Sequence, residues 1–248
     1  MLPPSGDVAV VIPARNESDR IGATVKAAAS LPGVDTVVVV DDGSADDTAA
    51  AAEAAVAAVM RHPRNRGKAA AMETGAEAVR LLEAGQDRAA PHHLLFLDGD
   101  LAETAGEAAP LAVPVRAGQA DMTIAVFSNR VKQGGHGFVV ALSGSGIMRA
   151  TGWRPAQPLN GQRCLTRAAF EAATPLAHGW GAETGLTIDL LRQGLRVVEV
   201  EVPLEHRATG RDWRSQLHRA RQFADVARAL ASRQPGARPV LTRFRYPG

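Results

Sequence analysis

The chain has 248 residues, of which 46% are hydrophobic and 4% aromatic, and its formal net charge is +2. This much apolar material builds a sizeable core, so a mainly disordered chain is excluded. No run of about 18 uncharged apolar residues is present, and the first residues lack a basic segment, so neither a spanning helix nor a signal peptide is expected. A single cysteine, Cys164, excludes a disulfide framework and a cysteine-based zinc site. We expect a soluble, cytoplasmic protein.

The charge is unevenly distributed along the chain. Residues 205–248 contain ten arginines against Glu205, Asp212 and Asp225, whereas the rest of the chain is mildly acidic. A basic C-terminal segment favours an anionic partner, such as a phosphate, a lipid headgroup or a nucleotide. High arginine and alanine usage together point to a composition bias, so arginine content alone does not indicate a nucleic-acid partner, and none is expected.

Short apolar runs alternate with alanine-rich stretches in the first hundred residues. The apolar runs predict strands at Val8–Ile12, Val37–Val40 and His93–Leu97. The stretches between them predict helices over Asp19–Ser30, Asp46–Met60 and Lys68–Leu82. Fully apolar strands that alternate with helices are typical of the α/β class, with a mostly parallel sheet and helices on both faces.

The second half of the chain is less regular. Further strands are predicted at Asp121–Phe127 and Arg196–Val202, and further helices over Glu183–Gln193 and Trp213–Ala231. Residues Gln133–Gly146 are rich in Gly and Ser, so we expect a mobile segment there. No internal repeat or linker is found, and a single domain followed by a frayed tail is expected.

Each of the first three predicted strands ends in a polar cluster: PARNES, DDGS and DGD. The carboxyl ends of parallel strands meet at one edge of a sheet, and ligands bind there. Asp98 and Asp100 stand one residue apart at such an end, where a cation or hydrogen-bond donors must compensate their charge. The pair suits Mg²⁺ or Mn²⁺ bridging a diphosphate. The alternative is an ordinary acidic turn that caps the next helix.

The other polar segments each have two interpretations. Asp42 can hydrogen-bond a base or ribose, or its turn can simply cap the next helix. Backbone N–H groups of Pro13–Glu17 can meet a nucleotide, or the segment is only a loop. Lys68 begins a helix after a basic loop and can hold a phosphate, although the spacing of a phosphate-binding loop fails at Pro63 and Ala69.

Two candidates come from the second half. His206 follows the last predicted strand among arginines, so it can complete a metal site, or it is a plain surface residue. Glu183 stands at a predicted helix start beside glycines, where it can face an acceptor hydroxyl or merely favour the helix dipole.

Taken in order, VVIPARNE, VVVDDGSADDT, RGK, LDGD and the late Glu-containing turn resemble the GT-A glycosyltransferases of family 2. PLNGQRCLTRAAF, GWGAETGLTIDLLRQGL and a His-Arg strand end are similar to the glucosyl-3-phosphoglycerate synthases. The resemblance implies a Rossmann-like GT-A domain over residues 1–233, followed by a tail over residues 234–248. Within the domain, residues 7–100 would form the nucleotide-binding half and residues 101–233 the acceptor half.

The resemblance also implies roles for individual residues. It places the uridine among Pro13, Ala14, Arg15 and Glu17, with Asp42 near the base. It places the diphosphate at Lys68, the ribose or sugar at Asp98, and the metal on Asp100 and His206. It places Glu183 between donor sugar and acceptor, with Asn160, Gly161 and Arg207 on the acceptor side.

The leading hypothesis is a glycosyltransferase that uses Mg²⁺ or Mn²⁺ to move a hexose of the glucose type from a UDP-sugar to a phosphate-bearing acceptor. Glu183, Asp100 and Lys68 would be its catalytic residues. The acceptor stays unidentified, because Gly134–Phe138 replaces the Gly-Arg-Val-Thr run with which the synthases hold phosphoglycerate. The alternatives are a polyprenyl-phosphate sugar transferase and a non-catalytic nucleotide-sugar-binding protein. Nucleotidylyl transfer is disfavoured because PARNES contains no glycine.

The C-terminal helix is predicted to carry one apolar stripe, with arginines off the stripe. The stripe consists of Trp213, Leu217, Ala220, Ala224, Ala227 and Ala231. It can pack on the domain, pair with a second subunit in a homodimer, or lie on an anionic membrane beside a lipid-phosphate acceptor. Few of its side chains are large, which disfavours the membrane, so we expect packing within the fold or at a dimer interface, with at most peripheral membrane association.

Overall fold

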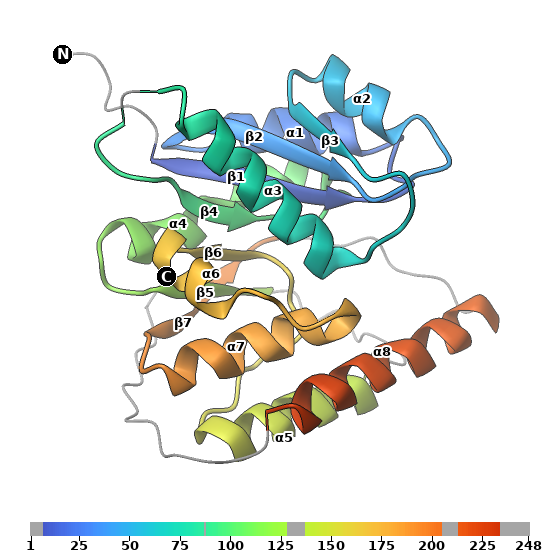
Figure 1. Ribbon diagram of the computed structural model, residues 1–248, viewed down its shortest axis with the longest axis vertical. Helices are drawn as coiled ribbons and strands as arrows, with labels where there is room; N and C mark the ends of the chain where they lie inside the picture. The colour runs from blue at the N-terminus through green and yellow to red at the C-terminus, as the bar shows by residue number, and fades with distance from the viewer. Residues whose placement is uncertain (1–6, 87, 128–136, 205–212, 234–248) are drawn as a thin grey trace.

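The computed structural model describes residues 7–86, 88–127, 137–204 and 213–233, which form a seven-stranded sheet between helices (Figure 1). The strand order is β3-β2-β1-β4-β6-β5-β7, and only β6 runs antiparallel to its neighbours. The strands are β1 (Val8–Ala14), β2 (Val34–Asp41), β3 (Ala58–Arg61), β4 (His93–Phe96), β5 (Met122–Phe127), β6 (Arg163–Leu165) and β7 (Val197–Val202). The predicted α/β class and mostly parallel sheet are confirmed.

Helices cover both faces of the sheet, because alternate strand residues point to opposite sides. The first core includes Val10 and Ile12, and the second includes Ala9 and Val11. The first face is covered by α1 (Ile21–Ala29), α2 (Thr48–Ala54), the 3₁₀ helix η1 (Ala102–Ala108) and α4 (Ala109–Arg116). The second is covered by α3 (Lys68–Glu83), α6 (Arg167–Ala173) and α7 (Ala182–Arg192), with η2 (Gly179–Gly181) before α7. Outside α7, α5 (Gly137–Thr151) and α8 (Trp213–Ala231) lie side by side (Figure 1).

The predicted helix over Asp46–Met60 is wrong in its second half. Helix α2 ends at Ala54, Val56 has a positive φ of 69°, and the chain then forms β3 at the sheet edge. Strand β3 pairs in parallel with β2 from Val38↔Ala58 to Asp41↔Arg61. The alanine run favours a helix, but hydrogen bonds to an open strand edge override that local preference.

The mobile segment expected at Gln133–Gly146 is also wrong over the residues described, because helix α5 starts at Gly137. Its buried residues Val139, Ser143, Ile147 and Thr151 recur every fourth position, which places them on one helical face. Ser143 Oγ lies 2.7 Å from Thr184 Oγ1 on α7. A β-carbon at Gly146 would collide with Leu230 of α8. The small residues that suggested mobility therefore allow close helix packing.

Helix α8 has the predicted bounds but buries a different face. In its described side chains, Gln222, Val226 and Ala229 are buried, whereas Ala231 of the predicted stripe is exposed. The helix contacts η2, α5 and α7, so this part packs within the fold. At about 100° per residue, Gln222, Val226 and Ala229 lie on the side of the helix opposite Ala224, Ala227 and Ala231, so the buried face is not the predicted stripe.

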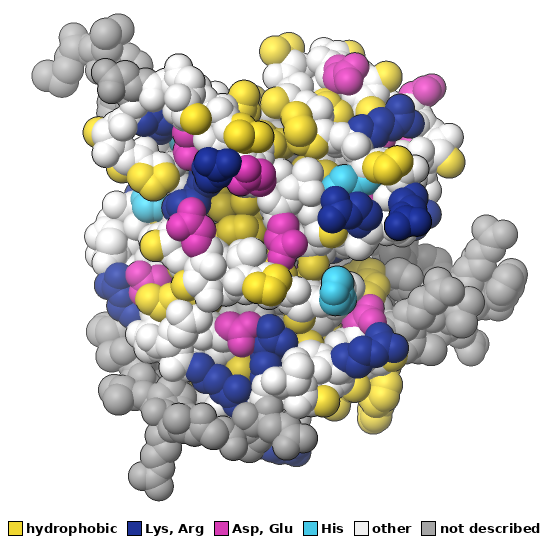
Figure 2. All heavy atoms as spheres, viewed as in Figure 1, with side chains coloured by type: hydrophobic (Ala, Val, Ile, Leu, Met, Phe, Trp, Pro, Cys, Tyr) yellow, Lys and Arg dark blue, Asp and Glu magenta, His cyan; other side chains and the backbone are white. Residues whose placement is uncertain are grey.

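The surface is mixed in character. On the face in Figure 2, acidic and basic side chains are interspersed, with small apolar groups between them. Within the described parts of the chain, no helix is both long and apolar enough to cross a bilayer.

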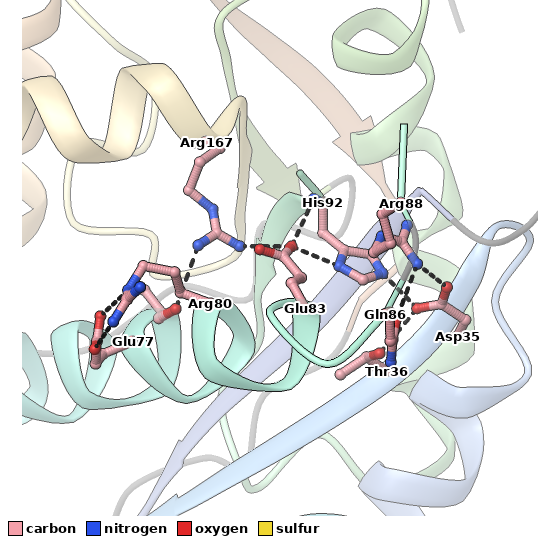
Figure 3. Close-up of polar contacts among 10 residues, drawn as sticks. Asp35, Thr36, Glu77, Arg80, Glu83, Gln86, Arg88, His92 and Arg167 are labelled. Carbon is pink, nitrogen blue, oxygen red and sulfur yellow. Dashed lines mark hydrogen bonds and ion pairs between the residues drawn. The ribbon is translucent and has the colours of Figure 1, made fainter. Parts of the chain in front are cut away.

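A buried ionic network joins the N-terminal ends of β2 and β4 to α3 and α6 (Figure 3). His92, which is 1% exposed, has Nδ1 2.7 Å from Glu83 Oε1 and Nε2 2.6 Å from Asp35 Oδ1. Arg167 donates to the same Glu83 oxygen at 3.0 Å, and Arg88 donates to Asp35 at 2.9 Å. Each ring nitrogen of His92 thus faces the carboxylate of a different element, and the ring joins Glu83 of α3 to Asp35 of β2.

The charges in this network support one another. Burial raises the pKa of Asp35, but hydrogen bonds from Thr36 and Arg88 and the charge of His92 outweigh it, so that pKa lies below its ordinary value of 3.8. The network therefore ties four elements together at the end of the sheet opposite the polar strand ends.

We predict that Glu83→Gln lowers the free energy of unfolding by about 3 kcal/mol, because it leaves the buried guanidinium of Arg167 without its carboxylate and removes one partner of His92. Urea denaturation measures this. Glu77→Gln on the same helix is the matched control, since its pair with Arg80 is exposed and contributes little. Equal effects of the two substitutions would contradict the prediction.

Candidate functional site

The polar clusters that end the first strands lie together at the carboxyl edge of the sheet, as predicted. Asn16 N donates to Ser44 Oγ at 3.0 Å, and Ala45 N donates back to Asn16 Oδ1 at 2.9 Å. Glu17 N donates to Thr48 Oγ1 at 2.9 Å. Asn16 has a left-handed φ of 57°, which Asn tolerates better than most residues. The loops after β1 and β2 therefore form one hydrogen-bonded unit.

The structure places the predicted uridine residues on this unit in different environments. Arg15 is exposed, and Pro13 and Glu17 are half-buried. Ala14 is buried in the first core, and its carbonyl oxygen accepts a hydrogen bond from Asp42 N at 2.9 Å. The side chain of Ala14 therefore belongs to the core, and the exposed parts of the loop are Arg15 and its neighbours.

Asp42 organises the loop between β3 and α3. Its Oδ1 accepts from His62 Nδ1 at 2.7 Å and from Arg66 N at 2.8 Å, and its Oδ2 accepts from Gly67 N at 2.8 Å. Gly67 has a φ of 90°, which glycine adopts without strain, and Lys68 begins helix α3 directly after it. Asp42 thus fixes the backbone directly before helix α3, from whose first residue the Lys68 side chain extends.

Lys68 forms the centre of the site. Its Nζ lies 2.6 Å from Asp98 Oδ1 and 3.2 Å from Glu183 Oε1. Gln162 Nε2 donates to the other oxygen of Asp98 at 2.7 Å. Burial lowers the pKa of Lys68, but the charges of Asp98 and Glu183 outweigh burial and raise it above the ordinary value of 10.5. Lys68 is therefore an ammonium that joins a carboxylate from each half of the chain.

Glu183 has unused hydrogen-bonding capacity in this cluster. Its side chain is 2% exposed, and among the residues that the structure describes its carboxylate has only the ion pair with Lys68. A buried carboxylate with so few donors is costly unless a ligand supplies more. At Gly161, a β-carbon would collide with Lys68 Nζ, so glycine is needed for the lysine to reach both acids.

The Asp98-Gly99-Asp100 turn is anchored by helix α1. Thr24 Oγ1 donates to Gly99 O at 2.9 Å and accepts from Ala102 N at 2.8 Å. Asp100 is half-buried at this turn. His206 and Arg207 lie outside the described residues, and no group of three metal ligands occurs among the residues that are described.

The predicted acceptor segment is held by a buried arginine. Arg163 is 0% exposed and donates to Asn160 O at 2.8 Å, Pro158 O at 3.0 Å and Glu183 O at 3.1 Å. Burial lowers the pKa of Arg163 to about 10, against the raising effect of the charges of Glu183 and Glu199. The Asn160 side chain is turned inward, where its Nδ2 donates to Ala125 O at 2.8 Å. Arg163 therefore connects the loop before β6 to the start of α7.

Three site residues were missed by the sequence interpretation: His62, Gln162 and Arg163. A signal for Gln162 and Arg163 was present in the sequence, because these two polar residues directly precede the apolar pair Cys164-Leu165. His62 lies in the loop before α3, of which the sequence indicated only that the loop is basic.

A hollow lies beside Asp42 at the same edge. It has a volume of about 330 Å³ and is lined by Gly43, Ser44, Arg61, His62 and Pro63. Its volume lies at the lower end of the range for small-ligand sites, which is about 300 to 1,000 Å³. The site therefore consists of a hollow beside one acid and a Lys68-centred cluster of two others.

The raised pKa of Lys68 predicts the pH range over which its ammonium stabilises the fold. Such stabilisation is complete below the unfolded value, here 10.5, and is lost as the pH rises through the folded value. We expect the difference in free energy of unfolding between the protein and Lys68→Met to stay constant from about pH 7 to about pH 10 in urea denaturation. A difference that shrank steadily over this range would contradict the assignment.

Comparisons with known proteins agree with this architecture. The sequence profile of glycosyl transferase family 2 matches residues 9–159. No curated protein matches the chain. Among solved structures, it is similar to glucosyl-3-phosphoglycerate synthase from Mycobacterium tuberculosis in complex with phosphoglyceric acid, with 26% identity over 91% of this chain and 79% of that one, and a TM-score of 0.68.

Two further complexes of that enzyme are similar over 91% of this chain and 79% of theirs. One contains Mn²⁺, UDP and glucosyl-3-phosphoglycerate, at 25% identity and a TM-score of 0.68. The other contains Mn²⁺, UDP-glucose and glycerol 3-phosphate, at 26% identity and a TM-score of 0.65. The predicted GT-A fold and the resemblance to these synthases are confirmed. Because the family profile covers more than half of the residues, the chain belongs to glycosyl transferase family 2.

Proposed function

We propose that this glycosyltransferase moves a hexose of the glucose type from UDP to a phosphate-bearing acceptor, with the help of Mg²⁺ or Mn²⁺. The observation that carries the proposal is the Lys68 ammonium between Asp98 and Glu183. A positive charge fixed between a strand-end acid and an otherwise unpartnered buried acid can meet the leaving diphosphate on one side and the acceptor on the other. The similar synthase structures, with UDP-glucose and phosphate-bearing acceptors, support this substrate class.

The donor set at the Asp98-Gly99-Asp100 turn fits a hard divalent ion. Carboxylate oxygens are the ligands that Mg²⁺ and Mn²⁺ prefer. We propose that Asp100 and His206 hold the ion, which would supply positive charge to the leaving diphosphate.

The remaining roles belong to residues of the chain itself. Lys68 would donate to a diphosphate oxygen, since its ammonium is retained at neutral pH. The unused oxygens of Glu183 would accept the hydrogen bond of the acceptor hydroxyl and orient it toward the sugar. Pro13, Arg15 and Glu17 would border the uridine, and Asp42 would meet its base. A carboxylate has about four acceptor positions, and three of those on Asp42 are used, so one remains.

The positive charge of the C-terminal segment supports a phosphate-bearing acceptor. The segment of residues 205–248, with ten arginines, begins directly after the strand end that precedes His206. We propose that Arg207 and the loop at Gly161 border a phosphate of the acceptor, because guanidinium groups bind phosphate oxygens in pairs.

Replacing Asp100 by Ala tests the metal assignment. We expect turnover to fall on the order of 10²-fold or more, as it does when a key electrostatic stabiliser is lost. The measurement is UDP release from UDP-glucose with Mn²⁺, with and without a chelator. Asp47→Ala, an exposed acid on the neighbouring loop, is the matched control and should change little.

The same assay separates the alternatives. UDP release that disappears with the chelator in the unmodified protein supports a metal-dependent transferase. UDP binding without any release and without metal dependence would instead indicate a non-catalytic binding protein. Near-normal turnover of Asp100→Ala at limiting Mn²⁺ would show that the metal ligand was wrongly assigned.

Base preference gives a second prediction. The remaining acceptor position of Asp42 suits the N3–H of uracil, whereas cytosine presents an acceptor there and would face the carboxylate unfavourably. We therefore expect UDP to raise the melting temperature more than CDP at equal concentration, because stabilisation grows with the logarithm of ligand concentration over Kd. Equal shifts for the two nucleotides would exclude Asp42 as the reader of the base.

A further inference from the structure

His62 lies between the hollow and Asp42. It is 5% exposed and stands at the start of the loop from β3 to α3, with its backbone N–H bonded to Asp41 O at 2.9 Å. On one side, Nδ1 lies 2.7 Å from Asp42 Oδ1. On the other side, Nε2 lies 3.0 Å from Thr74 Oγ1 of α3 and 3.4 Å from Arg66 Nη1. Both ring nitrogens therefore have partners, and the ring cannot rotate without losing them.

These partners define the tautomer of the ring. A carboxylate oxygen only accepts, so Nδ1 must carry a proton and donate it to Asp42. A guanidinium group only donates, so Nε2 must accept from Arg66, and the Thr74 hydroxyl can donate to the same nitrogen. The arrangement therefore assigns a proton to Nδ1 of His62, from which the ring donates to Asp42.

The hydrogen bond from His62 Nδ1 determines which acceptor positions of the Asp42 carboxylate stay open. Oδ1 receives two donors, from His62 and from the backbone of Arg66, whereas Oδ2 receives one, from Gly67. The His62 bond is the only one of the three that comes from a side chain, and it occupies the second acceptor position of Oδ1 beside the backbone N–H of Arg66. The open position is thus left on Oδ2 and can accept one further N–H.

We propose that His62 is a positioning residue that gives the nucleotide site its base preference through Asp42. By donating from Nδ1 it holds the carboxylate with one acceptor position open, which favours a base that presents an N–H, such as uracil, and disfavours cytosine. The inference rests on the proposed function, because it assumes that the hollow beside Asp42 receives a nucleoside diphosphate.

The test compares the Kd values of UDP and CDP for the unmodified protein and for three variants of His62. Both values are measured by isothermal titration calorimetry with Mn²⁺. We expect the unmodified protein to favour UDP by about tenfold or more, since a site with a buried hydrogen-bonding group discriminates strongly. His62→Leu, which cannot donate, should lower the ratio severalfold, because a second acceptor position then opens on Oδ1 and the carboxylate loses its side-chain donor. His62→Asn, whose amide N–H lies near the position of Nδ1, should restore most of the preference. His62→Gln, whose amide lies toward the Nε2 side, should restore less.

The ratio of the Kd values of UDP and CDP distinguishes a positioning role of His62 from an effect on the stability of the fold alone. His92→Asn is the matched control, because it damages a buried histidine on the opposite end of the sheet and should lower the melting temperature without changing the ratio. If His62→Leu does not fold, the comparison of His62→Asn with His62→Gln gives the same test.

The outcomes distinguish this inference from the proposed function. If the unmodified protein binds neither nucleotide, the proposed function is wrong, and the inference with it. If it discriminates between UDP and CDP and a folded His62→Leu keeps that ratio, or if the Asn and Gln variants are equal, the role of His62 is overturned and the proposed function stands.

Discussion

The site depends on one ammonium group held between two carboxylates. Asp98 comes from the end of β4 and Glu183 from the first turn of α7, so the acids belong to opposite halves of the chain. Without a cation between them they would repel each other in a poorly hydrated space. Much of the local structure serves to bring Lys68 Nζ to this point. Asp42 fixes Gly67 before the helix, Gly161 leaves room for the side chain, and Gln162 holds the second oxygen of Asp98.

The same cluster leaves polar capacity unused, which is a cost to stability. Among the described residues, the buried carboxylate of Glu183 is paired only with Lys68, and Arg163 is a fully buried cation whose pKa is lowered to about 10, chiefly by burial. Arg163 finds carbonyl oxygens and a hydroxyl as partners, and Thr187 Oγ1 lies 2.9 Å from its Nη1. Its charge nevertheless stabilises the charge of Glu183 at longer range. An unfilled acceptor next to two cations is expected where a ligand is to supply the missing donor.

The sequence predicted best what depends on local apolar pattern. Strands β1, β2 and β4 and helices α3 and α7 were found within a few residues, because their periodicity and their polar ends are strong. Strand β3 was missed because an alanine run favours a helix until a neighbouring strand edge is available. Strand β6 has only three residues and runs antiparallel, so no pattern could develop in it. The sequence identified four of the site residues as candidates: Asp42, Lys68, Asp98 and Glu183. The contacts among them arise from tertiary packing, which the spacing of residues in the sequence does not determine.

Two buried histidines illustrate how neighbours, and not residue type, determine chemistry. His92 lies between two carboxylates and joins Asp35 to Glu83 at the N-terminal ends of the strands. His62 lies between the Asp42 carboxylate on its Nδ1 side and the Thr74 hydroxyl and Arg66 guanidinium on its Nε2 side, so its Nδ1 donates to Asp42. The first arrangement uses the hydrogen-bonding capacity of the ring to lock structure. The second leaves one acceptor position of Asp42 available, and that difference separates the structural end of the sheet from the end where we propose that a nucleotide binds.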